Sequence, residues 1–91
     1  MKPKEILQSE GFVHIYEWKD LPNTVYEKHS HKDKVTLFIV AGDVTFTFSD
    51  GTMKSVYENE RFDVPVLKEH SAVVGINGCS YVVGEMIEGD S

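Results

Sequence analysis

The sequence predicts an all-β protein, a sandwich or barrel of about eight short strands. Runs of β-branched and aromatic residues follow one another from Gly11 onward. Clusters rich in Gly, Asp and Asn separate these runs at intervals of about 8–12 residues. With 91 residues, the chain has the length of a single domain, 1–91. This pattern leaves three architectures open: an immunoglobulin-like sandwich, an OB barrel and a double-stranded β-helix.

The first ten residues, 1–10, form the only expected helix. Pro3 suits the first turn of a helix, and Gly11 is a residue type that often ends one. Ile6 and Leu7 are the apolar residues expected to pack on the body of the protein. The β-barrel is expected over residues 11–87, and residues 88–91 are expected to form a frayed tail.

The expected strands are 12–18, 24–27, 35–40, 44–48, 53–57, 61–64, 71–76 and 80–87. Segment 44–48 alternates apolar and polar residues with period two, which predicts a half-buried strand. Segment 35–40 is a short apolar run, which predicts a buried strand. Asp50-Gly51 and Asn77-Gly78 are hairpin signals, and residues 41–43 are expected to form a further turn. The aromatic residues are expected mainly in the core, with a few lining the mouth of a barrel.

Composition excludes several classes of partner. The formal net charge is −6, from 9 basic and 15 acidic residues, and such a surface repels nucleic acid. No apolar run approaches the roughly 20 residues of a membrane helix, and no basic amphipathic helix is present. The single cysteine, Cys79, excludes an intramolecular disulfide and fits a reducing cytoplasm. A cytoplasmic protein without nucleic-acid or membrane partners is therefore expected.

Three of the four histidines form an informative pattern. His29 and His31 are two residues apart at the end of an expected strand, so both imidazoles face the same side. His70 lies far along the chain, just before another expected strand, and a closed barrel can bring it close to the pair. Three imidazoles can bind one metal ion and leave coordination positions open. Outside this group, His14 is expected to face solvent, and Cys79 is expected to be structural.

These residues resemble the two sequence motifs of the cupin family. In the first motif, two histidines separated by one residue are followed by a glutamate and then a glycine, and His29, His31 and Gly42 match it. In the second motif, a proline, a glycine and a histidine follow at fixed spacing, and Pro65 and His70 match the first and the last. The resemblance runs over nearly the whole chain. It implies a double-stranded β-helix, or jelly-roll barrel.

Three positions depart from the cupin pattern. The glutamate of the first motif falls on Val35, which cannot bind metal, and the glycine of the second motif falls on Leu67. The asparagine often found four residues after the second-motif histidine falls on Val74. The ligand set is thereby reduced to three histidines. A nearby carboxylate can replace the missing one or accept a hydrogen bond from an imidazole, and the candidates are Glu27, Asp33 and Glu69.

The resemblance implies a protein that binds a divalent transition metal and a small molecule in its barrel. Zinc, iron, nickel, copper and manganese all fit imidazole ligands, manganese less well. Some cupins with three histidine ligands are dioxygenases, which makes a related enzyme one reading, although the sequence indicates no catalytic residue. The alternatives are a non-catalytic ligand-binding or sensory cupin, with or without metal, and a purely structural dimer. The small core predicts a homodimer, and so does the resemblance, because cupins commonly dimerise through the edges of their sheets.

Overall fold

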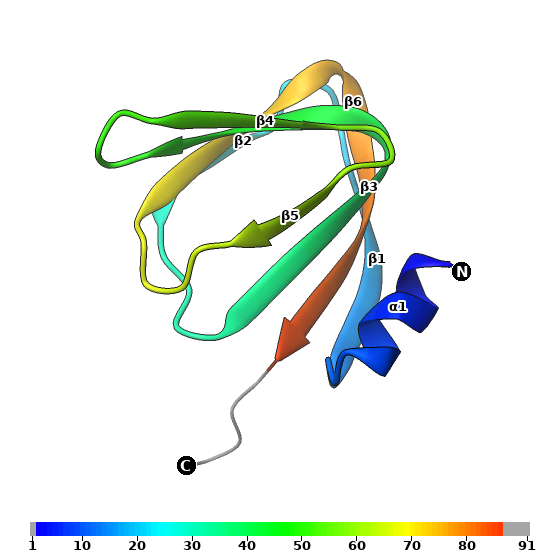
Figure 1. Cartoon of the computed structure of the whole chain (residues 1–91). Helices are drawn as coiled ribbons and strands as arrows, with labels where there is room; N and C mark the ends of the chain where they lie inside the picture. The colour runs from blue at the N-terminus through cyan, green and yellow to red at the C-terminus, as the bar shows by residue number, and fades with distance from the viewer. Residues whose placement is uncertain (1, 87–91) are drawn as a thin grey trace.

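A computed structural model describes residues 2–86, which form one short helix followed by six strands (Figure 1). The elements are α1 (Pro3–Ser9), β1 (His14–Asp20), β2 (Val25–His29), β3 (Lys34–Phe48), β4 (Met53–Tyr57), β5 (Arg61–Val64) and β6 (His70–Met86). The all-β prediction with an N-terminal helix is confirmed. The predicted tail at 88–91 and the end of the last predicted strand, Ile87, lie outside the described residues.

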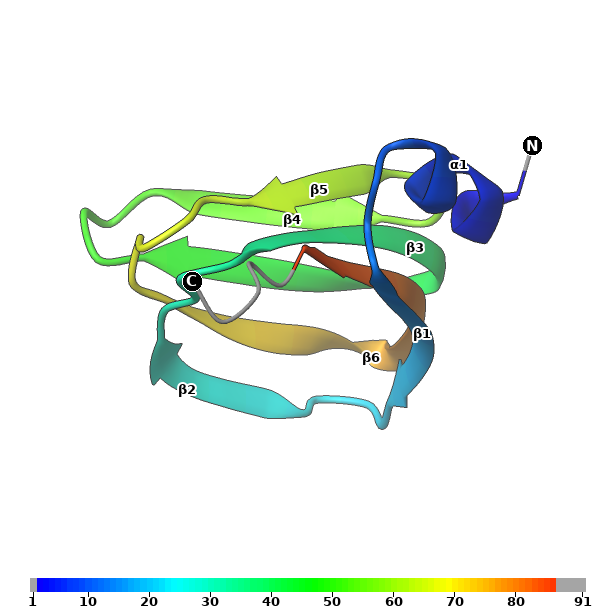
Figure 2. The ribbon, with the colours of Figure 1, turned by 90° about the horizontal axis from the view of Figure 1, so that it is seen from below.

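The two long strands β3 and β6 form the centre of the fold, and every strand pairing is antiparallel. The first half of β3 pairs with β5 and with the second half of β6, which in turn pairs with β1. The second half of β3 pairs with β4 and with the first half of β6, which pairs with β2. Figure 2 shows β3 and β6 between β4 and β5 on one side and β2 on the other. The result is a jelly roll, in which β3 and β6 contribute to both sheets.

Two of the predicted turns are wrong, because the chain continues through them as strand. The segments 35–40 and 44–48 are both parts of β3, and the segments beginning at 71 and at 80 are both parts of β6. Gly42 and Gly78 have φ values of 81° and 77°, and Gly42 pairs with Cys79 across the two strands. Register shifts on both sides of Gly42 mark a bulged corner, where each strand bends from one sheet into the other. The predicted hairpin at Asn77-Gly78 is therefore a bend within β6, whereas Asp50-Gly51 does connect β3 to β4.

The helix packs on the barrel through one fully buried residue. Leu7 has no exposed surface and forms a small cluster with Phe12 and Val82. Gly84 permits this approach, since a Cβ there would lie 3.0 Å from a methyl carbon of Leu7. Phe12 thus belongs to the helix contact, and β1 begins at His14, two residues later than predicted. No helix within residues 2–86 is long and apolar enough to cross a membrane.

The main core lies between the two halves of the jelly roll. The predicted alternation in 44–48 is confirmed, because Val44, Phe46 and Phe48 are buried and the threonines between them are only partly so. These side chains pack with Leu37 and Val83, which come from the other sheet. The core does not fill the whole space between the sheets, and the remaining cavity adjoins the candidate site.

Candidate metal centre

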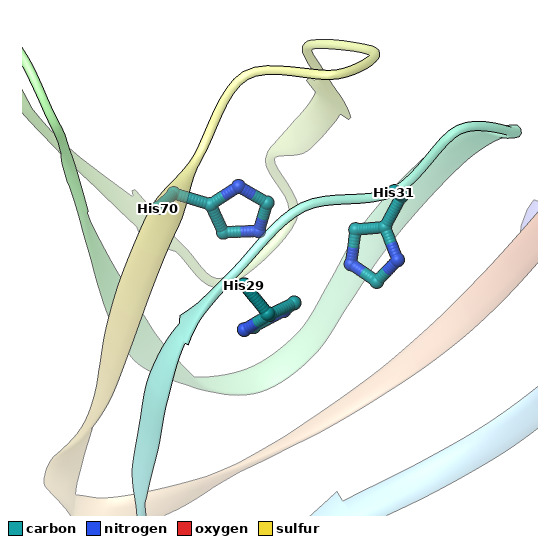
Figure 3. Close-up of side chains that lie close together, drawn as sticks. All are labelled: His29, His31 and His70. Carbon is teal, nitrogen blue, oxygen red and sulfur yellow. The ribbon is translucent and has the colours of Figure 1, made fainter.

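Three histidines that are distant in the sequence converge at one end of the jelly roll (Figure 3). His29 ends β2, His70 begins β6 and faces His29 across the two paired strands, and His31 lies in the connection to β3. The ring centroids are 4.6 Å apart for His29 and His70, 4.9 Å for His29 and His31, and 5.5 Å for His31 and His70. One ligand nitrogen from each ring lies within 4.8 Å of the other two. The structure thus brings together the three residues that the sequence suggested, and their role as ligands stays a prediction.

Backbone carbonyl groups orient two of these rings. Nδ1 of His29 lies 2.6 Å from the carbonyl oxygen of Glu27, and Nδ1 of His70 lies 2.9 Å from that of Lys68. Because a carbonyl oxygen can only accept, each Nδ1 must carry the proton and donate it. The Nε2 atom of each neutral ring then presents a lone pair, which is the arrangement that metal-binding histidines use.

Burial favours the neutral form of the third ring, His31. Burial is the main cause that lowers the pKa of His31, and the neighbouring His29 and His70 lower it further. His31 is half-buried, and its carbonyl oxygen accepts a hydrogen bond of 2.7 Å from the backbone N–H of Leu67. Leu67 has a φ of 60°, a left-handed conformation that favours glycine. This explains why the motif places glycine there, and the bond ties the loop before His70 to His31.

None of the three carboxylates proposed from the sequence joins the histidines. Within residues 2–86, the one group of potential metal ligands consists of His29, His31 and His70 alone. Glu27 is exposed and contributes its backbone carbonyl. The carboxylate of Glu69 lies 3.8 Å from the ammonium group of Lys28 at the surface.

A different carboxylate, Glu85, lines the cavity beside the histidines. Glu85 faces Val35 directly across β3 and β6, so the adjacent strand carries an acid opposite the position that lacks one. Its carboxylate accepts a hydrogen bond of 3.1 Å from the Tyr16 hydroxyl and lies 3.0 Å from Nδ1 of His14. No sequence spacing could have indicated Glu85, because only the register of the two strands places it opposite Val35.

The cavity next to the histidines has a volume of about 300 Å³. Apolar side chains such as Leu37 and Phe46 form much of its wall, and the three histidines, Asp20 and several phenol groups supply the polar part. A mainly apolar cavity with a few converging polar groups is typical of a small-molecule site, and this volume is at the lower end of such sites.

His14 and Cys79 lie outside the histidine cluster. The side chain of His14 is 55% exposed. Cys79 is buried, and burial together with Asp20 and Asp43 raises the pKa of its thiol to about 11. A thiol of this kind is almost wholly protonated at neutral pH and is a poor nucleophile.

Comparison with known proteins identifies the fold. No protein-family sequence profile and no curated protein matches the chain. Among solved structures, protein NMB1881 from Neisseria meningitidis is 26% identical, with a TM-score of 0.70 over 96% of this chain and 98% of that one. An RmlC-like cupin from Shewanella frigidimarina is 19% identical, with a TM-score of 0.68 over 87% of this chain and 70% of that one. The chain has the cupin fold.

The cupin fold is also that of a metal-dependent enzyme. Oxalate decarboxylase from Bacillus subtilis, which has Mn(II) centres, is 20% identical to this chain with a TM-score of 0.70. The match covers 85% of this chain and 22% of the decarboxylase, so this chain spans about a fifth of that enzyme. At this identity, the likeness establishes the fold alone.

Proposed function

We propose that this cupin binds one divalent transition-metal ion through His29, His31 and His70, and a small molecule in the adjoining cavity. The observation that carries the proposal is the convergence of three imidazoles, two of them oriented by backbone carbonyl groups, at the wall of a cavity.

The donor set fits such an ion. Zinc, iron, nickel, copper and manganese are all bound by imidazole nitrogen, so the donors select a class of metal rather than one metal. Two nitrogens bound to one tetrahedral zinc ion are about 3.4 Å apart, as follows from zinc–nitrogen bonds of about 2.1 Å. The present limit of 4.8 Å means that binding would draw the rings slightly together. A bound ion would act as a Lewis acid toward a ligand in the cavity.

The first candidate function is binding of the small molecule without a reaction. The second is an oxygenase reaction, which the all-histidine donor set favours. The only thiol in residues 2–86 is buried and protonated, so this part of the chain provides no activated cysteine. Oxygen uptake by the iron-loaded protein with thiols, diketones and catechols separates the two candidates. The homodimer also stays a prediction, and sedimentation at micromolar concentration tests it.

The metal site predicts a stoichiometry that one substitution abolishes. After dialysis against zinc and then against metal-free buffer, elemental analysis is expected to find about one ion per chain in the wild-type protein. His70→Gln is expected to retain less than a tenth of that amount, because losing one of three protein ligands removes much of the affinity.

His14→Gln is the matched control, since it makes the same substitution at an exposed histidine outside the cluster. It is expected to retain the wild-type amount of zinc. Equal zinc content in the two variants would show that the ion binds elsewhere.

A further inference from the structure

A second polar cluster lines the same cavity and has no part in the proposed metal site. It consists of Trp18, Asp20, Tyr26 and Tyr81, here called the aromatic–Asp20 cluster. Asp20 is only 7% exposed. Its Oδ1 atom accepts hydrogen bonds from the Trp18 indole N–H at 2.9 Å and from the Tyr26 hydroxyl at 2.5 Å, and its Oδ2 atom accepts one from the Tyr81 hydroxyl at 2.8 Å.

These bonds commit the hydrogen-bond donors of the cluster to Asp20. Burial, followed by the bond to Asp20, raises the pKa of both Tyr26 and Tyr81, so both phenols stay protonated and keep donating to Asp20. The indole N–H is committed in the same way. What remains for a ligand is the lone pairs of two phenol oxygens and the negative faces of three aromatic rings.

The charged groups in the cavity wall are negative, so they attract a cation as the aromatic rings do. Among the described residues, its walls contain the acids Asp20 and Glu85 and no lysine or arginine. Tyr16, the other phenol of the wall, donates its hydroxyl proton to Glu85, and burial together with Glu85 raises its pKa to about 12. An anionic group beside Asp20 would find no partner there, whereas a cation would meet the buried carboxylate of Asp20 and the aromatic rings around it.

We propose that the aromatic–Asp20 cluster binds a cationic nitrogen, an ammonium or quaternary ammonium group, on the small molecule that occupies the cavity. The aromatic rings provide cation–π contact, and the carboxylate of Asp20 provides a negative charge beside them. Trp18 is 51% exposed, so the cluster reaches the surface and a ligand can approach it. The inference rests on the proposed use of the cavity as a ligand site.

The position of the cluster relative to the histidines also indicates which second group the ligand carries. Asp20 pairs with Cys79 beside the corner of β6, whereas His70 is the first residue of that strand. Trp18, Asp20 and Tyr81 therefore lie on the sheet that contains the second half of β6, whereas His29 and His70 lie on the sheet that contains its first half. A ligand that reaches both carries its cationic nitrogen at one end and a metal-binding group, such as a carboxylate or hydroxyl, at the other.

Choline and 3,3-dimethylbutanol form a matched pair of probes, because they have the same shape and differ in a charged nitrogen against a neutral carbon. Trp18 is the only tryptophan in the chain, so its fluorescence reports occupancy directly. In metal-free wild-type protein, choline is expected to bind saturably and 3,3-dimethylbutanol about tenfold more weakly or worse. Equal affinity for the two probes, or saturable binding of neither, would overturn the inference.

Two variants locate the binding. Asp20→Asn is expected to weaken choline binding about tenfold, and Glu17→Gln, which removes an exposed carboxylate from the same strand, is expected to leave it unchanged. Thermal melting first confirms that each variant is folded, and the comparison of the two probes on wild-type protein does not depend on either variant. His70→Gln is expected to lose zinc and to keep choline, so the metal site and the cation site succeed or fail separately.

Discussion

Saturating zinc is expected to raise the Tm of the wild-type protein by about 10–20 °C and to leave that of His70→Gln unchanged. The three ligands come from the end of β2, the loop after it and the start of β6, so they meet only in the folded chain. An ion present at a hundred times its Kd stabilises such a fold by about 2.7 kcal/mol. In a domain of this size, each kcal/mol corresponds to about 4–8 °C. Differential scanning calorimetry with and without zinc measures the shift.

The controls exclude a general effect of the metal. EDTA is expected to reverse the shift, and His14→Gln is expected to show it in full. His31→Gln provides a second loss variant at a half-buried position, in case the change at buried His70 impairs folding. A wild-type Tm that zinc leaves unchanged would contradict the metal site.

Gly42→Ala is expected to lower the free energy of unfolding by about 2–5 kcal/mol. A Cβ at this position would lie 2.0 Å from the carbonyl oxygen of Gly78, a backbone atom that cannot turn aside. The φ of 81° adds the cost of a left-handed conformation. The contact lies at the corner where β3 and β6 pass from one sheet to the other. Urea denaturation measures the loss.

Gly51→Ala separates the two causes. Gly51 has a similar φ of 89°, but a Cβ there would meet nothing within 4 Å. It is therefore expected to lose only the conformational term, about 1 kcal/mol. An equal loss of stability in the two variants would contradict the close contact between Gly42 and Gly78 at the corner.

Local sequence patterns were sufficient to predict most of the helix and strand segments. They were insufficient at the corner formed by Gly42 and Gly78. The alternation in 44–48 and the helix before Gly11 depend on neighbouring residues alone, and both are present in the structure. Gly42 and Gly78 are ambiguous, since a positive φ serves a hairpin turn and a bulge equally well. Which of the two forms depends on the strand that pairs on the other side, and no local pattern contains that information.

The same distinction applies to the site. His29, His31 and His70 match a family motif, and the motif indicated that they belong together. Glu85 and the aromatic–Asp20 cluster match no spacing, because their side chains come from β1, β2 and β6 and meet through cross-strand pairs such as Trp18 with Tyr81. Their arrangement is a property of the register, which only the structure supplies.

Anomalous diffraction at the zinc absorption edge, from crystals of the zinc-loaded protein, tests the metal centre most directly. We predict one strong peak per chain, about 2.0–2.1 Å from a ring nitrogen of each of His29, His31 and His70. A fully loaded protein whose peak lies away from these three rings would contradict the proposed site.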